Sequence, residues 1–155
     1  MEVYDKIAAI ILAGGVGTRM GDPQKHKCKY EINGIPSIAL LLKTLREIEI
    51  NTNVLVVGAL SEQIMELVSQ DFNDVIYAYQ PEQKGTGNAA KHGLYPLERA
   101  GFEGTVLIIA GDAYIEREIL SKLIKRGQDS DLTFLLKKKE DVSTARRIIQ
   151  NENGK

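Results

Sequence analysis

IAAIILAGGVGTRM, at residues 7–20, is the stretch that decides the fold. Its first half, Ile7 to Leu12, is an uninterrupted apolar run, which is typical of a parallel strand buried on both faces. Gly14, Gly15 and Gly17 then let the backbone turn sharply and approach a ligand closely. Consecutive N–H groups in such a turn form an anion cradle, and Arg19 adds a positive charge beside it. The stretch therefore predicts a strand followed by a phosphate-binding loop.

Other loops with similar glycines make demands that this chain does not meet. A dinucleotide-binding loop needs G-x-G-x-x-G/A and an acidic residue at the end of the second strand. Here Thr18, Arg19 and Met20 follow Gly17, and the second strand ends in Gly58-Ala59. The pattern GxxxxGK[ST] is absent as well. Taken alone, the glycine loop remains compatible with a simple tight turn between a strand and a helix.

Composition limits the classes of function. The 155 residues carry 20 basic and 21 acidic side chains, a net charge of −1, which disfavours a nucleic-acid partner. The single cysteine excludes an internal disulfide. The first residues lack the pattern of a signal peptide, and no apolar run approaches the roughly 20 residues of a membrane span. We expect a cytoplasmic protein without a membrane partner, and oligomers remain possible.

Strand and helix patterns alternate along the chain. Helices are expected at 37–48, at 61–69 with Ser61 as N-cap, at 87–99 and at 116–126. Strands are expected at 6–12, 53–57, 75–79, 105–110 and 131–136. This order predicts an α/β domain with a mainly parallel sheet, whose ligands bind at the carboxyl ends of the strands.

A second motif, QPEQKGTGNA at residues 80–89, follows the third expected strand. The amides of Gln80 and Gln83 offer both a donor and an acceptor, which suits recognition of a nucleobase edge. Gly85 and Gly87 permit close backbone approach at the start of a helix, where the positive end of the helix dipole favours anions. The competing interpretation is an N-terminal helix turn with incidental glutamines.

A third motif, IIAGD at residues 108–112, is an apolar strand that delivers a carboxylate to the same edge. Asp112 at that position suits Mg2+, whose remaining ligands would be water and substrate phosphates. Asp112 could otherwise be an ordinary turn residue.

Together, LAGGVGTRM, QPEQKGTGNA and GD resemble the nucleotidyltransferase domains of the nucleotide-sugar pyrophosphorylases, and are most similar to those that transfer uridylyl groups to N-acetylglucosamine 1-phosphate. The resemblance implies a Rossmann-like three-layer α/β/α fold, the nucleotide-diphospho-sugar transferase fold. It implies that Arg19 and a lysine bind phosphates and that Asp112 binds Mg2+. The implied nucleotide-binding set is Leu12, Ala13, Gly14, Gly15, Gly17, Thr18, Gln80, Gln83, Gly85, Thr86 and Gly111.

Two lysines compete for the phosphate-binding role. The family has a Pro-Lys pair seven residues before the glycine of a turn, and counting back from Gly34 gives Lys27, preceded here by His26 instead of proline. Lys25 is the alternative. We expect Lys27 to be catalytic together with Arg19, and expect packing or surface roles for His26 and Cys28.

The reaction implied by the resemblance is the attack of a sugar 1-phosphate on a nucleoside triphosphate, with UTP favoured, releasing pyrophosphate. The alternatives are a non-catalytic regulatory or assembly relative and a cytidylyl- or molybdopterin-type nucleotidyltransferase. Residues 1–155 are expected to form one nucleotidyltransferase domain that is incomplete at its C-terminus, because residues 147–155 resemble a strand and turn after which family domains add the sugar pocket and a second magnesium ligand. We therefore expect this chain to be the nucleotide-binding half, which binds nucleotide without completing catalysis. Arg146 stands where close relatives have a glycine near the sugar, which leaves the sugar open.

Overall fold

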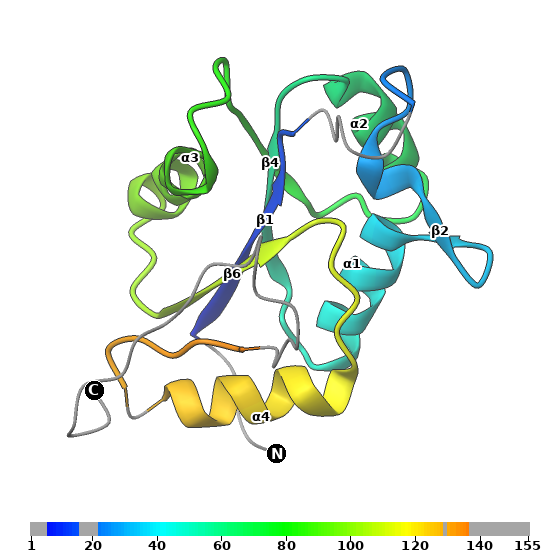
Figure 1. Ribbon diagram of the computed structural model, residues 1–155. Helices are drawn as coiled ribbons and strands as arrows, with labels where there is room; N and C mark the ends of the chain where they lie inside the picture. Colours follow the sequence, from blue (N-terminus) through cyan, green and yellow to red (C-terminus); the bar gives the residue numbers. More distant parts are fainter. Residues whose placement is uncertain (1–5, 16–21, 129, 137–155) are drawn as a thin grey trace, which may run out of the picture.

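The computed structural model describes residues 6–15, 22–128 and 130–136, and its centre is a four-stranded parallel sheet (Figure 1). The strands are β1 (Ile7–Ala13), β4 (Thr52–Val57), β5 (Ile76–Tyr79) and β6 (Thr105–Ala110). Their order in the sheet is β5-β4-β1-β6. The strand that precedes the glycine loop therefore lies inside the sheet, with a parallel neighbour on each side.

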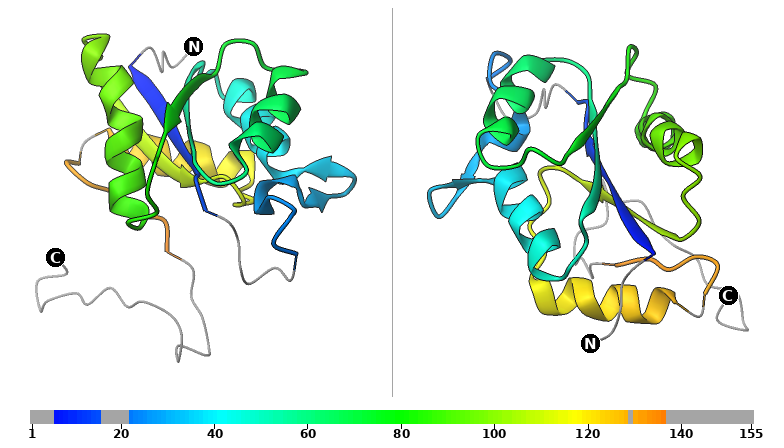
Figure 2. Two further views of the ribbon diagram at one scale, coloured as in Figure 1. Left: turned by 90° about the horizontal axis from the view of Figure 1, so that it is seen from above. Right: turned by 180° about the vertical axis from the view of Figure 1, so that it is seen from behind.

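Helices cover both faces of this sheet (Figures 1 and 2). They are α1 (Ser37–Glu47), α2 (Ser61–Ser69), α3 (Thr86–Arg99) and α4 (Arg117–Gly127). One apolar cluster joins the sheet to α1, α2 and α4, and a second joins its other face to α3. The Rossmann-like three-layer α/β/α architecture expected from the sequence is confirmed.

The apolar run of β1 supplies both of these clusters. Ala9 and Ile11 pack toward α1, α2 and α4, whereas Ala8 and Ile10 pack toward α3, and all four side chains are fully buried. Successive side chains of a strand point to opposite faces, so a strand covered on both sides must be apolar at every position. This is the physical reason for the uninterrupted run at residues 7–12.

A small excursion connects β1 to α1. It contains the short 3₁₀ helix η2 (Lys27–Lys29) and an antiparallel hairpin of β2 (Glu31–Ile32) and β3 (Ile35–Pro36). Asn33 and Gly34 form its turn with φ of 52° and 81°, the left-handed pair that tight hairpins require. The excursion matters because η2 carries Lys27.

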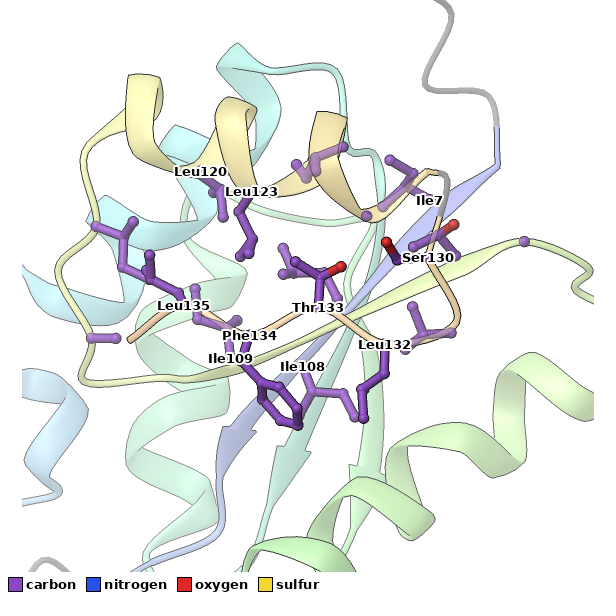
Figure 3. A pocket seen from close by; sticks show the side chains of 18 of the residues that line it. Ile7, Ile108, Ile109, Leu120, Leu123, Ser130, Leu132, Thr133, Phe134 and Leu135 are labelled. Carbon is purple, nitrogen blue, oxygen red and sulfur yellow. The ribbon is translucent and has the colours of Figure 1, made fainter. Parts of the chain in front are cut away.

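The strand expected at residues 131–136 is not formed. The segment lies near β6 and α4 but is separated from them by an apolar cavity of about 730 Å³ (Figure 3). Alternating apolar residues satisfy strand propensity, but a strand also needs a hydrogen-bonded neighbour, and none is present among the described residues. Leu132 and Phe134 are instead 71% and 61% exposed.

The expected N-cap at Ser61 is also wrong, although α2 begins where predicted. Ser61 is the first helical residue, and the cap is Leu60, which adopts a left-handed conformation with φ of 55° and makes no side-chain cap bond. The backbone N–H of Ser61 donates to the Gly58 carbonyl at 3.2 Å. A tight backbone turn has taken the place of a side-chain cap.

None of the helices in the described ranges has the length and apolar character needed to cross a membrane.

Candidate functional site

The parallel register brings the ends of all four strands to one edge of the sheet. Ala13 pairs with Val57, Val57 with Tyr79, and Leu12 with Ala110. The residues that follow these strands, Gly14, Gly58, Gln80 and Gly111, must therefore lie close together. The edge predicted to bind ligand is built by strand register from four distant parts of the chain.

Gln80 is buried beneath the glycine loop. Its side-chain Nε2 donates to Asn88 Oδ1 at 2.9 Å, and the residue is only 4% exposed. A Cβ built on Gly14 would lie 2.6 Å from Gln80 Oε1, so a side chain at this position would force the Gln80 amide to move. The exposed Gln83 reaches the same loop, donating from Nε2 to the Gly14 carbonyl at 3.0 Å. The two predicted glutamines thus converge on the glycine loop.

Gly58 is a part of this arrangement that the sequence did not reveal. A Cβ at Gly58 would lie 2.8 Å from the Gly14 carbonyl oxygen and 3.3 Å from that of Gln80. Both neighbours are backbone atoms, which cannot swing away. Gly58 therefore allows the glycine loop and the loop after β5 to approach each other across the end of β4. Its position at a strand end was visible in the sequence, but its neighbours were not.

The loop after β5 ends at the start of α3. Gly85 precedes the helix with φ of 91°, a conformation that side chains rarely adopt, and Thr86 is the first helical residue. No side chain in the described part of the chain caps α3. An uncapped helix start presents amide donors and a partial positive charge, which suits an anionic ligand. Gly85 and Thr86 are both exposed at this start.

Lys27 and Asp112 form an ion pair at the end of β6, which is separated in the sheet from the Gln80 end of β5 by β4 and β1. Lys27 Nζ lies 3.0 Å from Asp112 Oδ1, with the two side chains 21% and 41% exposed. A Cβ on Gly15 would lie 3.8 Å from Lys27 Cε, so the lysine stem also runs beside the loop. Lys25 points elsewhere, with its Nζ 4.6 Å from the centre of the Tyr30 ring. Of the two competing lysines, Lys27 is the one that the structure brings to Asp112.

Gly111 allows the end of β6 to pack closely against η2. A Cβ there would lie 3.0 Å from Cys28 Sγ and 3.3 Å from the Leu12 carbonyl oxygen. The Gly111 N–H donates to that same Leu12 carbonyl at 2.9 Å. This close packing fixes where the following Asp112 leaves the sheet.

His26 and Cys28 flank Lys27 and are both fully buried. Burial lowers the pKa of His26, opposed by the hydrogen bond to the Ala13 carbonyl, so the ring is neutral near pH 7. Burial raises the pKa of Cys28 to about 12, which keeps the thiol protonated and unreactive. The expected packing role fits Cys28, whereas His26 makes specific hydrogen bonds that the sequence did not indicate.

Three of the predicted site residues, Gly17, Thr18 and Arg19, lie outside the described residues. Their predicted phosphate contacts remain predictions.

The donor set at this edge is compatible with Mg2+. Asp112 offers one partly exposed carboxylate beside the glycine loop, and the described residues contain no group of three or more histidines, cysteines or carboxylates that could enclose a metal. Mg2+ commonly binds through one or two carboxylates together with water and substrate phosphates. Asp112 would hold such an ion only in partnership with a bound phosphate compound.

The cavity of about 730 Å³ beside β6 is a separate feature (Figure 3). Its lining comes from β6, α4 and residues 130–135 and is largely apolar. It contains none of Gly14, Lys27, Gln80 or Asp112. The candidate site is therefore the open edge formed by the strand ends, not this cavity.

Comparison with known proteins identifies the family. The family model described as the MobA-like NTP transferase domain matches residues 9–146. Among curated relatives, the bifunctional protein GlmU of Pelobacter propionicus is 37% identical over 154 residues, covering 97% of this chain and 33% of that protein. GlmU of Geotalea uraniireducens is 33% identical, with coverage of 97% and 33%. The chain thus spans about a third of the length of these relatives.

Solved structures give the same picture. HddC from Yersinia pseudotuberculosis is 25% identical with a TM-score of 0.65, covering 80% of this chain and 55% of that one. A structure of HddC complexed with GMP-PN is 28% identical with a TM-score of 0.64 and the same coverage. A nucleotidyl transferase from Methanothermobacter thermautotroptrophicus, at 23% identity, TM-score 0.64 and coverage of 78% and 57%, shares the fold.

The family match, the nucleotide-diphospho-sugar transferase fold and the GlmU relatives confirm the resemblance stated from the motifs, and the chain belongs to the MobA-like NTP transferase domain family of nucleotidyltransferases.

Proposed function

We propose that this chain binds a nucleoside triphosphate for transfer of its nucleotidyl group to a sugar 1-phosphate, with release of pyrophosphate. The observation that carries the proposal is the convergence of the glycine loop, Gln80, Gln83 and the Lys27–Asp112 pair on one sheet edge. Gln80 follows β5 and Asp112 follows β6, and β1 with its glycine loop lies between these two strands in the sheet. This order matches that of a nucleotide, which has a base at one end and phosphates at the other.

In the proposed reaction, a phosphate oxygen of the sugar 1-phosphate attacks the α-phosphorus in line, and pyrophosphate leaves. The attacking group is already an anion, so no general base is required. What must be overcome is repulsion between two polyanions and the charge that develops on the bridging and leaving oxygens. The side chain of Lys27 and the amides of the glycine loop provide positive potential and hold the phosphates in line. Mg2+ held by Asp112 would neutralise phosphate charge.

The favoured base is uracil, and the second candidate is guanine. Uracil is favoured by the motif resemblance. Guanine is suggested by the HddC structure with GMP-PN, which is 28% identical to this chain. Gln80, with its Oε1 against Gly14 and its Nε2 bound to Asn88, is the side chain that we expect to distinguish the bases.

The test is a calorimetric titration of the 155-residue chain with UTP, CTP, GTP, ATP and dTTP, each with and without Mg2+. We expect one base to bind at least about tenfold more tightly than the others, a difference of about 1.4 kcal/mol that one discriminating hydrogen bond can supply. Gln80→Leu should remove the preference, whereas Lys91→Ala, an exposed change on α3, should leave it intact. Failure of all five nucleotides to bind would reject the proposal.

A further inference from the structure

His26 connects three separate segments beside the proposed site. Its ring Nε2 lies 2.8 Å from the Ala13 carbonyl oxygen at the end of β1, and its Nδ1 accepts the Cys28 N–H at 3.1 Å. Its own backbone N–H donates to Gln63 Oε1 on α2 at 3.1 Å. The residue is fully buried.

These contacts define one form of the ring. Because Nδ1 accepts a hydrogen bond from a backbone N–H, the single proton of the neutral imidazole must lie on Nε2, from which it donates to the Ala13 carbonyl. The ring therefore uses both nitrogens in different roles. The backbone contact adds a constraint, since proline, which the motif resemblance places at this position, has no N–H to give to Gln63.

Both ring contacts act on groups that bear on the site. The Ala13 carbonyl belongs to the peptide that links Ala13 to Gly14, and in a planar trans peptide the Gly14 N–H points opposite to that carbonyl. Holding the carbonyl thus fixes the direction of the first amide of the glycine loop. The Cys28 amide lies in η2 immediately after Lys27, whose Nζ is 3.0 Å from Asp112.

We propose that His26 is a positioning residue, whose imidazole clamps the end of β1 to η2 and so sets both the first glycine-loop peptide and the placement of Lys27 against Asp112. This inference rests on the proposed function, because a change in nucleotide affinity can be measured only if the chain binds a nucleotide. His26 stands where the motif resemblance places a proline, and the motif alone gave no indication of this role.

Two substitutions separate the two ring contacts. His26→Asn places an amide oxygen near the position of Nδ1 and can keep the Cys28 contact, but it is too short to reach Ala13. His26→Gln extends an amide nitrogen toward the position of Nε2 and can restore the Ala13 contact. The matched control is Asn53→Ala, which removes a buried hydrogen bond, Asn53 Nδ2 to the Ile50 carbonyl at 3.1 Å, at the other end of the sheet.

Each variant is measured in three ways: affinity for the preferred Mg2+–nucleotide by calorimetry, melting temperature, and backbone amide resonances by NMR. For His26→Asn we expect affinity to fall about tenfold, the effect of about one hydrogen bond, with shifts at the Gly14 and Asp112 amides. His26→Gln should recover most of both. Asn53→Ala should lower the melting temperature without changing affinity or those amide shifts.

The inference is overturned if His26→Asn keeps wild-type affinity and wild-type Gly14 and Asp112 amide resonances while melting earlier, because His26 would then be only a packed core residue. It is equally overturned if Asn53→Ala weakens binding as much for the same loss of melting temperature. If the wild-type chain binds no nucleotide, the proposed function fails, and the amide resonances alone decide whether His26 positions the loop.

Discussion

The ion pair between Lys27 and Asp112 is poorly suited to stabilising the fold. Both side chains are partly exposed, and pairs of this kind contribute about 0 to 1 kcal/mol to the free energy of unfolding. The same two charges lie beside the glycine loop, where under the proposed function a triphosphate would pair with Lys27 and Mg2+ would pair with Asp112. In the proposed function, Lys27 and Asp112 are two binding groups that neutralise each other when no ligand is bound.

Lys27→Met should therefore weaken nucleotide binding far more than it weakens the fold. We expect affinity to fall by about 10- to 100-fold, the range for losing a hydrogen bond to a charged group. The midpoint of urea unfolding should change little. Lys25→Met, which removes a cation contact with the Tyr30 ring outside the site, is the matched control and should leave affinity unchanged. Equal effects of the two variants would contradict the choice of Lys27.

Asp112→Asn should act through the metal. It keeps the size of the side chain but removes the charge that Mg2+ prefers. We expect the gain in nucleotide affinity on adding Mg2+ to shrink or disappear, while affinity without Mg2+ stays the same or rises because Lys27 is released. Calorimetry at several Mg2+ concentrations measures this. A Mg2+ effect equal to that of the wild type would remove Asp112 from the metal site.

His26 makes stability depend on pH. Its pKa in the folded protein lies below the ordinary value of 6.5, so the unfolded chain binds the extra proton more readily. The contribution to the free energy of unfolding is complete above about pH 6.5 and is lost as the pH falls toward the lowered pKa. Urea unfolding between about pH 7.5 and 5 should show this decline, and His26→Gln should lack that part of it. An unchanged pH profile in the variant would contradict the assignment.

At the scale of the elements, strand ends and glycines organise the site. The residues that follow β1, β4, β5 and β6 lie together at one edge of the sheet. The glycines among them leave room for the neighbouring loop backbones and for the Gln80 side chain. The strands fix where the site residues lie, and the loops after them carry the side chains and backbone amides of the candidate site. A substitution that leaves every helix and strand intact can therefore still disturb the site.

Gly58→Ala tests this directly. The new methyl group would meet the Gly14 and Gln80 carbonyl oxygens, so one of the two loops must move. We expect a loss of about 1–3 kcal/mol in the free energy of unfolding, as for other overpacked positions, together with weaker nucleotide binding. Gly87→Ala, where a Cβ has open space, should leave stability unchanged or raised. A fully stable Gly58→Ala would show that the loops adjust freely.

The sequence predicted these elements because their signals are local. The apolar run of β1 and the periodic apolar residues of α1 report which faces are buried, and the helix and strand bounds agree with the structure to within a residue or two. Residues 131–136 carried an equally strong local signal. They failed as a strand because strand formation also depends on a neighbour, which a local pattern cannot supply.

The site was predictable to the extent that motifs lie at strand ends. Gln80, Gly111 and Asp112 were expected at the sheet edge, and the register places them there. Gly58 and His26 were not foreseen, since their importance arises from contacts with residues far away in sequence. A glycine or histidine alone does not indicate which backbone it will touch.

At the scale of the whole molecule, β5 and β6 are the two edge strands of the sheet, and β6 is the one that faces the apolar cavity. Among the described residues nothing pairs with the outer edge of β6, and apolar side chains are exposed beside it. Ile108 is 51% exposed, close to Leu132 and Phe134 across the cavity (Figure 3). Exposed strand edges with apolar surroundings favour association with other chains.

We expect this chain to associate as its concentration rises. Phe134→Lys should reduce the association, because a charge beside the outer edge of β6 discourages pairing. Light scattering across a dilution series measures the mass directly. Tyr95→Lys, an exposed aromatic change on α3, is the matched control and should have no effect. A constant monomer mass for the wild type at all concentrations would contradict the prediction.

The strand order has a further consequence for how the chain folds. β1 is synthesised before the other strands of the sheet, and Ile7 must wait for Thr105, about 100 residues later, before its second neighbour exists. Closing such a long loop costs chain entropy before any contact repays it. During synthesis the most apolar strand of the sheet is therefore available to incorrect partners for most of the time that the ribosome takes to make the domain, and folding should be slow compared with that of helical proteins of this size.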